Sequence, residues 1–185
     1  MTTATTIPGY VVGTWDIDAA HSDVSFSVRH MMVSKVRGRF TGVSGELVTA
    51  EKFEDSTVTA TVDATSLTTG QDQRDGHIRS ADFFDVEKYP EWTFRSTGIA
   101  AKGDDHVLTG DLTIKGVTRP VEFDLELNGF GPDPYGGTRS GFTATTTIKR
   151  SEFGVDIELP MDGGGVVVSE KVNVQLEIEA VLRAS

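Results

Sequence analysis

The chain contains no cysteine. Its absence excludes disulfides, thiolate nucleophiles and zinc sites built on thiolates, and it fits a reducing compartment. Basic residues are also scarce, because 17 Lys and Arg stand against 28 Asp and Glu, giving a formal net charge of −11. Such a balance opposes contact with nucleic-acid phosphates and with anionic bilayers. We therefore expect neither a nucleic-acid partner nor stable insertion into a membrane.

The sequence has no apolar run of transmembrane length. The first thirty residues also lack a basic segment followed by an apolar core of about 7 to 15 residues, so no secretory signal is visible. We expect a cytoplasmic protein. The Thr-rich residues 1–8 show no apolar period and are expected to form a flexible tail, whereas 9–185 are expected to form one domain.

Most of the chain alternates between apolar and polar residues, which is typical of strands with one dry face and one wet face. The pattern is most regular at 171–182 and recurs, in full or in part, at 15–17, 24–29, 36–49, 58–62, 92–96, 108–114, 118–130 and 142–148. These segments predict an all-β fold. Because closure removes exposed strand edges, we favour an eight-stranded antiparallel up-and-down barrel over two packed sheets.

One segment interrupts the strands. Residues 64–90 are too many for a hairpin turn, and connections of this length usually carry function. We expect a short helical lid at about 72–89, with Ser80 as the N-cap of a turn through Asp82–Phe84. Pro90 would end that turn before the next strand.

Five blocks of sequence carry a resemblance to a known family. They are WDIDAAHSDVSFSVRH (15–30), RGRF (37–40), QRDGHIRSADFFD (73–85), GDLTIKGVTRP (110–120) and RSEFG (150–154). In content and order they resemble the YceI-like family. The resemblance implies an extended, lipocalin-like barrel whose pore holds a long apolar molecule, a polyisoprenoid or a related fatty-chain lipid. Many family members begin with a secretion signal, which is not visible here.

The residues agree with that implication. If the apolar faces point inward, a hydrocarbon chain would meet few polar groups in the lumen, and about ten buried methylenes would supply roughly 8 kcal/mol before ordering costs. Periodicity alone equally allows a filled, dry core. The predicted ligand-binding residues, in the lumen and the lid, are Phe26, Val28, His30, Phe40, Val58, Val62, His77, Ile78, Arg79, Phe83, Phe84, Phe94, Leu112, Phe123, Leu125, Phe142, Ile148, Val174, Leu176 and Ile178.

The polar lid residues have two interpretations. Arg79, near His77, could bind a phosphate or carboxylate headgroup at the mouth of the barrel. Alternatively, the charged residues of the lid pair with one another and only hold it in place; they are Arg74, Asp75, Arg79, Asp82 and Asp85.

The remaining histidines are similarly open to interpretation. His30 lies on the apolar face of its strand, where it either bonds a core neighbour or meets a headgroup. Asp18 could orient His21 or simply cap a turn, and a metal site formed by His21, His30 and His77 with Asp18 has no supporting local spacing. His106 is expected to be an exposed hairpin residue.

No Walker loop, nucleophile elbow, HExxH motif or EF-hand loop occurs. We therefore predict no catalytic residues, no metal and no cofactor other than the lipid itself. The leading hypothesis is a protein that stores, shields or carries a long-chain isoprenoid or fatty-chain lipid. Two alternatives remain: an enzyme that acts on a bound lipid through Asp18, His21 and His30, and a stress-linked scaffold with a filled barrel. A homodimer through the lid or the 129–137 turn is left open.

Overall fold

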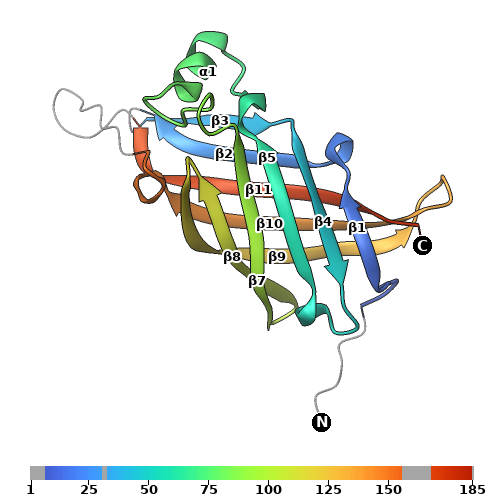
Figure 1. Cartoon of the computed structure of the whole chain (residues 1–185). Helices are drawn as coiled ribbons and strands as arrows, with labels where there is room; N and C mark the ends of the chain where they lie inside the picture. Colours follow the sequence, from blue (N-terminus) through green and yellow to red (C-terminus); the bar gives the residue numbers. More distant parts are fainter. Residues whose placement is uncertain (1–6, 31–32, 156–167, 185) are drawn as a thin grey trace.

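A computed structural model describes residues 7–30, 33–155 and 168–184. Within these ranges the chain forms a closed antiparallel β-barrel with one α-helix over one end, as predicted (Figure 1). The barrel strands are β1 (Gly13–Ile17), β2 (Asp23–His30), β3 (Ser34–Phe40), β4 (Val43–Thr49), β5 (Thr57–Asp63), β7 (Glu91–Lys102), β8 (Asp105–Ile114), β9 (Val117–Pro132), β10 (Thr138–Lys149) and β11 (Val168–Leu182).

Two of the eight barrel strands are broken. β1 and β2 together form one of these barrel strands, which the short 3₁₀ turn η1 (Ala19–His21) interrupts. β3 and β4 together form the neighbouring barrel strand. β1 pairs with β4 while β2 pairs with β3. The long β11 closes the barrel because its C-terminal end pairs with β1 and its N-terminal part pairs with β2.

The segment 36–49, predicted as one strand, therefore forms two strands, because the chain turns between Phe40 and Val43. At the break, the Gly42 amide donates to Ser66 Oγ at 2.9 Å, and its carbonyl accepts from the Asp63 amide at 2.8 Å. These bonds replace the strand ladder where the chain turns. The two-residue strand β6 (Leu67–Thr68), which adds to the edge of β3, was not predicted.

One end of the barrel is closed by aromatic packing. The Tyr10 ring meets Phe53 and Phe130 edge-on at centroid distances of 6.1 and 5.2 Å, and Trp15 meets Phe130 at 5.6 Å. Trp15 is fully buried and donates its indole N–H to Thr49 Oγ1 at 3.0 Å. In the predicted flexible tail, Ile7 packs against this cluster, while 1–6 lie outside the described residues.

The opposite end is covered by α1 (Asp72–Arg79), which lies above β3 and β5 in Figure 1. A helix within the predicted lid is therefore present, and it ends at Ser80, whose amide donates to the His77 carbonyl at 3.0 Å. The turn predicted to follow Ser80 is also found, because Ser80 Oγ accepts from the Asp82 amide at 3.4 Å and the Ser80 carbonyl accepts from the Phe83 amide at 3.0 Å. The acidic first turn and basic last turn of 72–79 suit the helix dipole, a signal that favours this placement.

None of the helices in the described residues is both long and apolar enough to span a bilayer.

Candidate ligand-binding site

The barrel encloses a cavity of about 330 Å³ between the aromatic end and α1. That volume lies in the range of sites that hold small organic ligands. Inward-facing side chains such as Phe26, Val28 and Ile148 are only partly buried although they point into the barrel. Their remaining exposed surface faces the cavity, so these side chains do not fill the interior.

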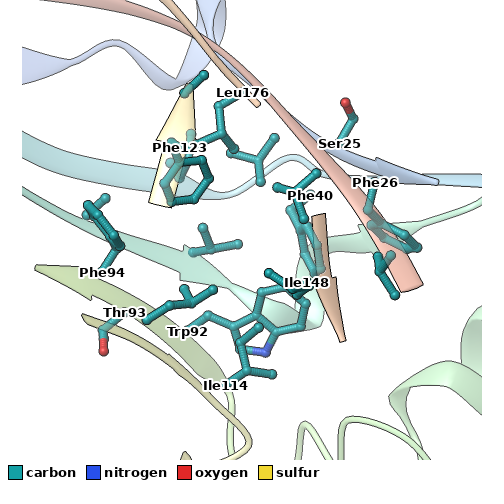
Figure 2. Close-up of a pocket in the computed structure, with 18 of the residues that line it drawn as sticks. Ser25, Phe26, Phe40, Trp92, Thr93, Phe94, Ile114, Phe123, Ile148 and Leu176 are labelled. Carbon is teal, nitrogen blue, oxygen red and sulfur yellow. The ribbon is translucent and has the colours of Figure 1, made fainter. Parts of the chain in front are cut away.

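The walls of the cavity are almost entirely apolar. Figure 2 shows Phe40, Phe94 and Phe123 among the rings and aliphatic groups around it, with the hydroxyls of Ser25 and Thr93 directed away. The Phe94 and Phe123 rings meet edge-on at 5.5 Å. An apolar cavity offers water few hydrogen bonds and therefore favours an apolar ligand.

The wall is shaped by glycines as well as by rings. A Cβ on Gly38 of β3 would lie 2.4 Å from the Phe26 ring, and one on Gly110 of β8 would lie 2.4 Å from the Phe94 ring. Both rings therefore pack directly on the backbone of a neighbouring strand, which only glycine permits. This packing holds the two rings back against the wall.

Every ionisable residue in the described cavity lining is basic. Arg29, Arg74, His77 and Arg150 line it, and all four come from α1 or from strand ends near it. Arg150 is almost fully buried and donates to the carbonyls of Val155 at 2.8 Å and Ser169 at 3.0 Å. The cavity therefore has an apolar body and a positively charged end beneath the lid.

The lid is fixed to the barrel by hydrogen bonds to β6 and to Thr69, the residue that follows it. The buried Asp75 carboxylate accepts from the Thr69 amide at 2.9 Å and from its hydroxyl. Arg74 donates to the same residue, from Nε to Oγ1 at 2.8 Å and from Nη2 to the carbonyl oxygen at 3.0 Å. Arg79 donates to the carbonyl of Leu67. These bonds determine where α1 sits over the cavity.

The hypothesis that the charged lid residues pair with one another is thus wrong, because their partners lie elsewhere. Among the described residues, Arg74 and Arg79 bind the β6 segment, and Asp82 contacts His77 Nε2 at 3.1 Å. Arg74, Asp75 and Arg79 still hold the lid in place, as expected, but they do so through hydrogen bonds to Thr69 and Leu67.

The structure places most predicted ligand-binding residues in the cavity lining. Those that line it are Phe26, Val28, Phe40, Val58, Val62, His77, Ile78, Phe83, Phe84, Phe94, Leu112, Phe123, Leu125, Phe142, Ile148, Val174, Leu176 and Ile178. Arg79 lies outside the lining because it turns toward β6. His30 ends β2, and its side chain is not among those described. Contact of any of these residues with a ligand remains a prediction.

Sequence reasoning missed several lining residues, notably Arg29, Arg74, Trp92 and Arg150. Trp92 could have been found, since it begins a strand directly after the lid. Its indole Nε1 is buried and lacks a hydrogen-bond partner among the described residues. Arg74 and Arg150 lie outside the strands, where alternation gives no information on direction, and Arg29 lies on the polar face of β2 near its end.

Asp18 and His21 form a separate cluster outside the cavity. His21 Nδ1 lies 2.8 Å from the Asp18 carboxylate, as the sequence suggested, but Arg139 bonds the same carboxylate at 2.8 Å and Glu179 at 3.2 Å. Arg139, and then His21, lower the pKa of Asp18 to about 2. Because the Arg139 guanidinium bonds both carboxylates, the cluster acts as an ion-pair network joining η1 to β10 and β11.

The convergence of histidines considered for an enzyme or metal site is not found in the described part of the chain. His21 contacts Asp18, whereas His77 contacts Asp82 in the lid. The prediction that His106 is exposed is also wrong. Its side chain is 12% exposed, packs edge-on against Phe53 at 4.9 Å and lies 3.6 Å from Glu54, because η2 (Phe53–Asp55) folds over the start of β8.

The chain matches the model of the YceI-like domain over residues 15–180. It belongs to the YceI-like family. A UPF0312 protein of Vibrio parahaemolyticus is 42% identical over 168 residues, which cover 90% of this chain and 85% of the relative. The protein YceI of Escherichia coli O17:K52:H18 is 38% identical over 167 residues, covering 90% and 84%.

Solved structures agree with the fold. The crystal structure of Burkholderia cenocepacia BcnA is similar at a TM-score of 0.76 and 26% identity, covering 88% of this chain and 98% of BcnA. A second neighbour, described as a polyisoprenoid-binding domain of Saccharophagus degradans implicated in plant cell wall breakdown, has a TM-score of 0.70 and 18% identity over 94% of this chain and 100% of the domain. At that identity the second likeness concerns the YceI-like fold alone.

Proposed function

We propose that this YceI-like barrel holds the chain of a long isoprenoid or related fatty-chain lipid in its cavity, for storage, shielding or transport. The observation that carries the proposal is the apolar cavity that the inward faces leave unfilled. Burying about ten methylenes there would contribute roughly 8 kcal/mol before the cost of ordering the chain. The polyisoprenoid-binding description of a protein with the same fold supports the same class of ligand.

The charged end of the cavity favours a lipid with an anionic or strongly polar headgroup. Arg29, Arg74 and His77 lie there, without a carboxylate in the described lining. A guanidinium binds phosphate or carboxylate oxygens through charge-assisted hydrogen bonds. In this arrangement the hydrocarbon enters tail first, and the headgroup stays beneath α1.

The binding role is better supported than an enzymatic one. The candidate catalytic pair, Asp18 and His21, lies in the Arg139 network rather than in the cavity lining. A lipid in the cavity would not reach it. A cytoplasmic location and the homodimer remain predictions from the sequence.

Native mass spectrometry of the freshly purified protein tests the proposal, followed by organic extraction and addition of a long-chain prenyl alcohol. We expect either a co-purifying lipid that extraction releases or uptake of one prenyl chain per barrel. A protein at its bare chain mass that takes up neither the prenyl alcohol nor a fatty acid would refute the binding role.

A further inference from the structure

The charge of the molecule is unevenly distributed. On the outer face of four adjacent strands lie six of the chain's 17 Lys and Arg residues: Lys149 on β10, Lys171 on β11, Arg29 on β2, and Lys35, Arg37 and Arg39 on β3. Lys149 faces Lys171 across one ladder, and Arg29 faces Lys35 across another. We call these six residues the basic face.

The side chains of the basic face are exposed, and none has an ion pair within the described ranges. β3 and β10 carry no acidic residue, and the one on β2, Asp23, lies at its far end. On β11, Glu170 is held by the amide and hydroxyl of Ser151, whereas Glu177 and Glu179 lie toward the other end of the strand. A concentrated positive field therefore persists on a protein whose net charge is −11.

Two further observations indicate what this face meets. Val33, in the turn between β2 and β3, is 84% exposed and lies in the chain between Arg29 and Lys35 of the basic face. An exposed apolar tip beside cations matches the interface of a bilayer, where apolar groups enter the headgroup layer and cations meet lipid phosphates. In addition, the basic face lies beside the charged end of the cavity, because Arg29 is among the residues that border the cavity there.

We propose that the basic face and Val33 dock the barrel on an anionic phospholipid bilayer, with the charged end of the cavity beside the membrane. Docking is a property of the outer surface and needs no ligand in the barrel. Docking would let a lipid pass between the bilayer and the cavity without crossing water, and this use of docking rests on the proposed function. A long nucleic acid fits less well, because its phosphates would extend from the basic face over the acidic remainder of the surface.

The test is co-sedimentation with vesicles of phosphatidylcholine mixed equally with phosphatidylglycerol, compared with vesicles of phosphatidylcholine alone. The wild-type protein is expected to bind the anionic vesicles at about 10 mM salt, where the Debye length is about 30 Å, and more weakly at about 0.15 M. It should bind the neutral vesicles far less.

The decisive variant is Lys35→Gln with Lys171→Gln, because neither residue lines the cavity. Binding to anionic vesicles should fall about thirtyfold, equivalent to about 2 kcal/mol for two surface cations. The matched control, Lys52→Gln with Arg95→Gln, makes the same change in net charge away from the basic face and should bind as wild type. Val33→Ser should weaken binding about tenfold while leaving the salt dependence unchanged.

Three results would overturn docking: no binding to anionic vesicles, equal losses in the two double variants, or equally tight and equally variant-sensitive binding to a single-stranded oligonucleotide. The last would assign the face to nucleic acid. The proposed function fails independently, since a protein that docks but neither contains nor takes up lipid contradicts only the cavity assignment.

Discussion

Replacing Ala60 by phenylalanine places a ring inside the cavity. Ala60 lies on β5, opposite Phe94 in the ladder, and its side chain lines the cavity wall. The new ring would take the space of about four ligand methylenes. At about 0.8 kcal/mol each, the loss is about 3 kcal/mol, so a prenyl chain should bind about 200-fold more weakly.

The neighbouring residue provides the control. Thr59 is exposed on the outer face of the same strand, so Thr59→Phe adds the same ring outside the barrel. Uptake of a long-chain prenyl alcohol, titrated by native mass spectrometry, should be nearly unchanged in this variant. Thermal unfolding of both proteins separates blocked binding from misfolding, because a ring that fits the cavity should leave the stability of Ala60→Phe equal or higher. Equal affinities of the two variants would refute the cavity as the binding site.

Other consequences concern the wall and the ion-pair network. Gly38→Ala should lower the free energy of unfolding by about 1 to 3 kcal/mol, because its Cβ would lie 2.4 Å from the Phe26 ring, whereas Gly131→Ala meets no atom within 4 Å and should have little effect in chemical denaturation. Because the folded pKa of Asp18 is about 2, below the ordinary 3.8, its contribution is present above about pH 4 and lost as pH falls toward 2. Asp18→Asn should therefore cost on the order of 1 to 2 kcal/mol at pH 7 and progressively less in acid-denaturation curves, and a difference constant with pH would contradict the pairing. Finally, ligand uptake should change tryptophan emission in the wild type and not in Trp92→Phe, since Trp92 lines the cavity while the other tryptophan is fully buried at the aromatic end.

The regular strands could be predicted because their alternation reports burial directly. The segment at 171–182, for example, falls within β11, and its alternating apolar residues from Val172 to Ala180 line the cavity. The break of the predicted 36–49 strand could not be predicted in this way. It depends on bonds from Gly42 to Ser66 and Asp63, which are distant in sequence.

The polar residues near the lid were the least predictable part of the site. Alternation assigns a face to a residue inside a strand, but Arg79 lies at a helix end, where tertiary contacts decide its direction. It turned to the carbonyl of Leu67, while Arg74, which the sequence had assigned only a structural role, lines the cavity. His106 was misplaced for a related reason, since its burial comes from η2, a turn about fifty residues earlier in the chain.

The presence of a cavity rather than a filled core was also beyond the reach of periodicity, which is identical in both cases. Side-chain volumes and the packing of Phe26 and Phe94 on glycines decide it, and both depend on strand register. The family resemblance supplied what the pattern lacked.

A crystal structure of the protein grown with a long-chain prenyl alcohol would show whether a lipid chain lies inside the barrel. We expect continuous density from beneath α1, past Trp92 and Phe40, toward Phe123, with the polar end near Arg29 or Arg74. A well-ordered barrel whose cavity stays empty while the prenyl alcohol binds only to the outer surface would contradict it.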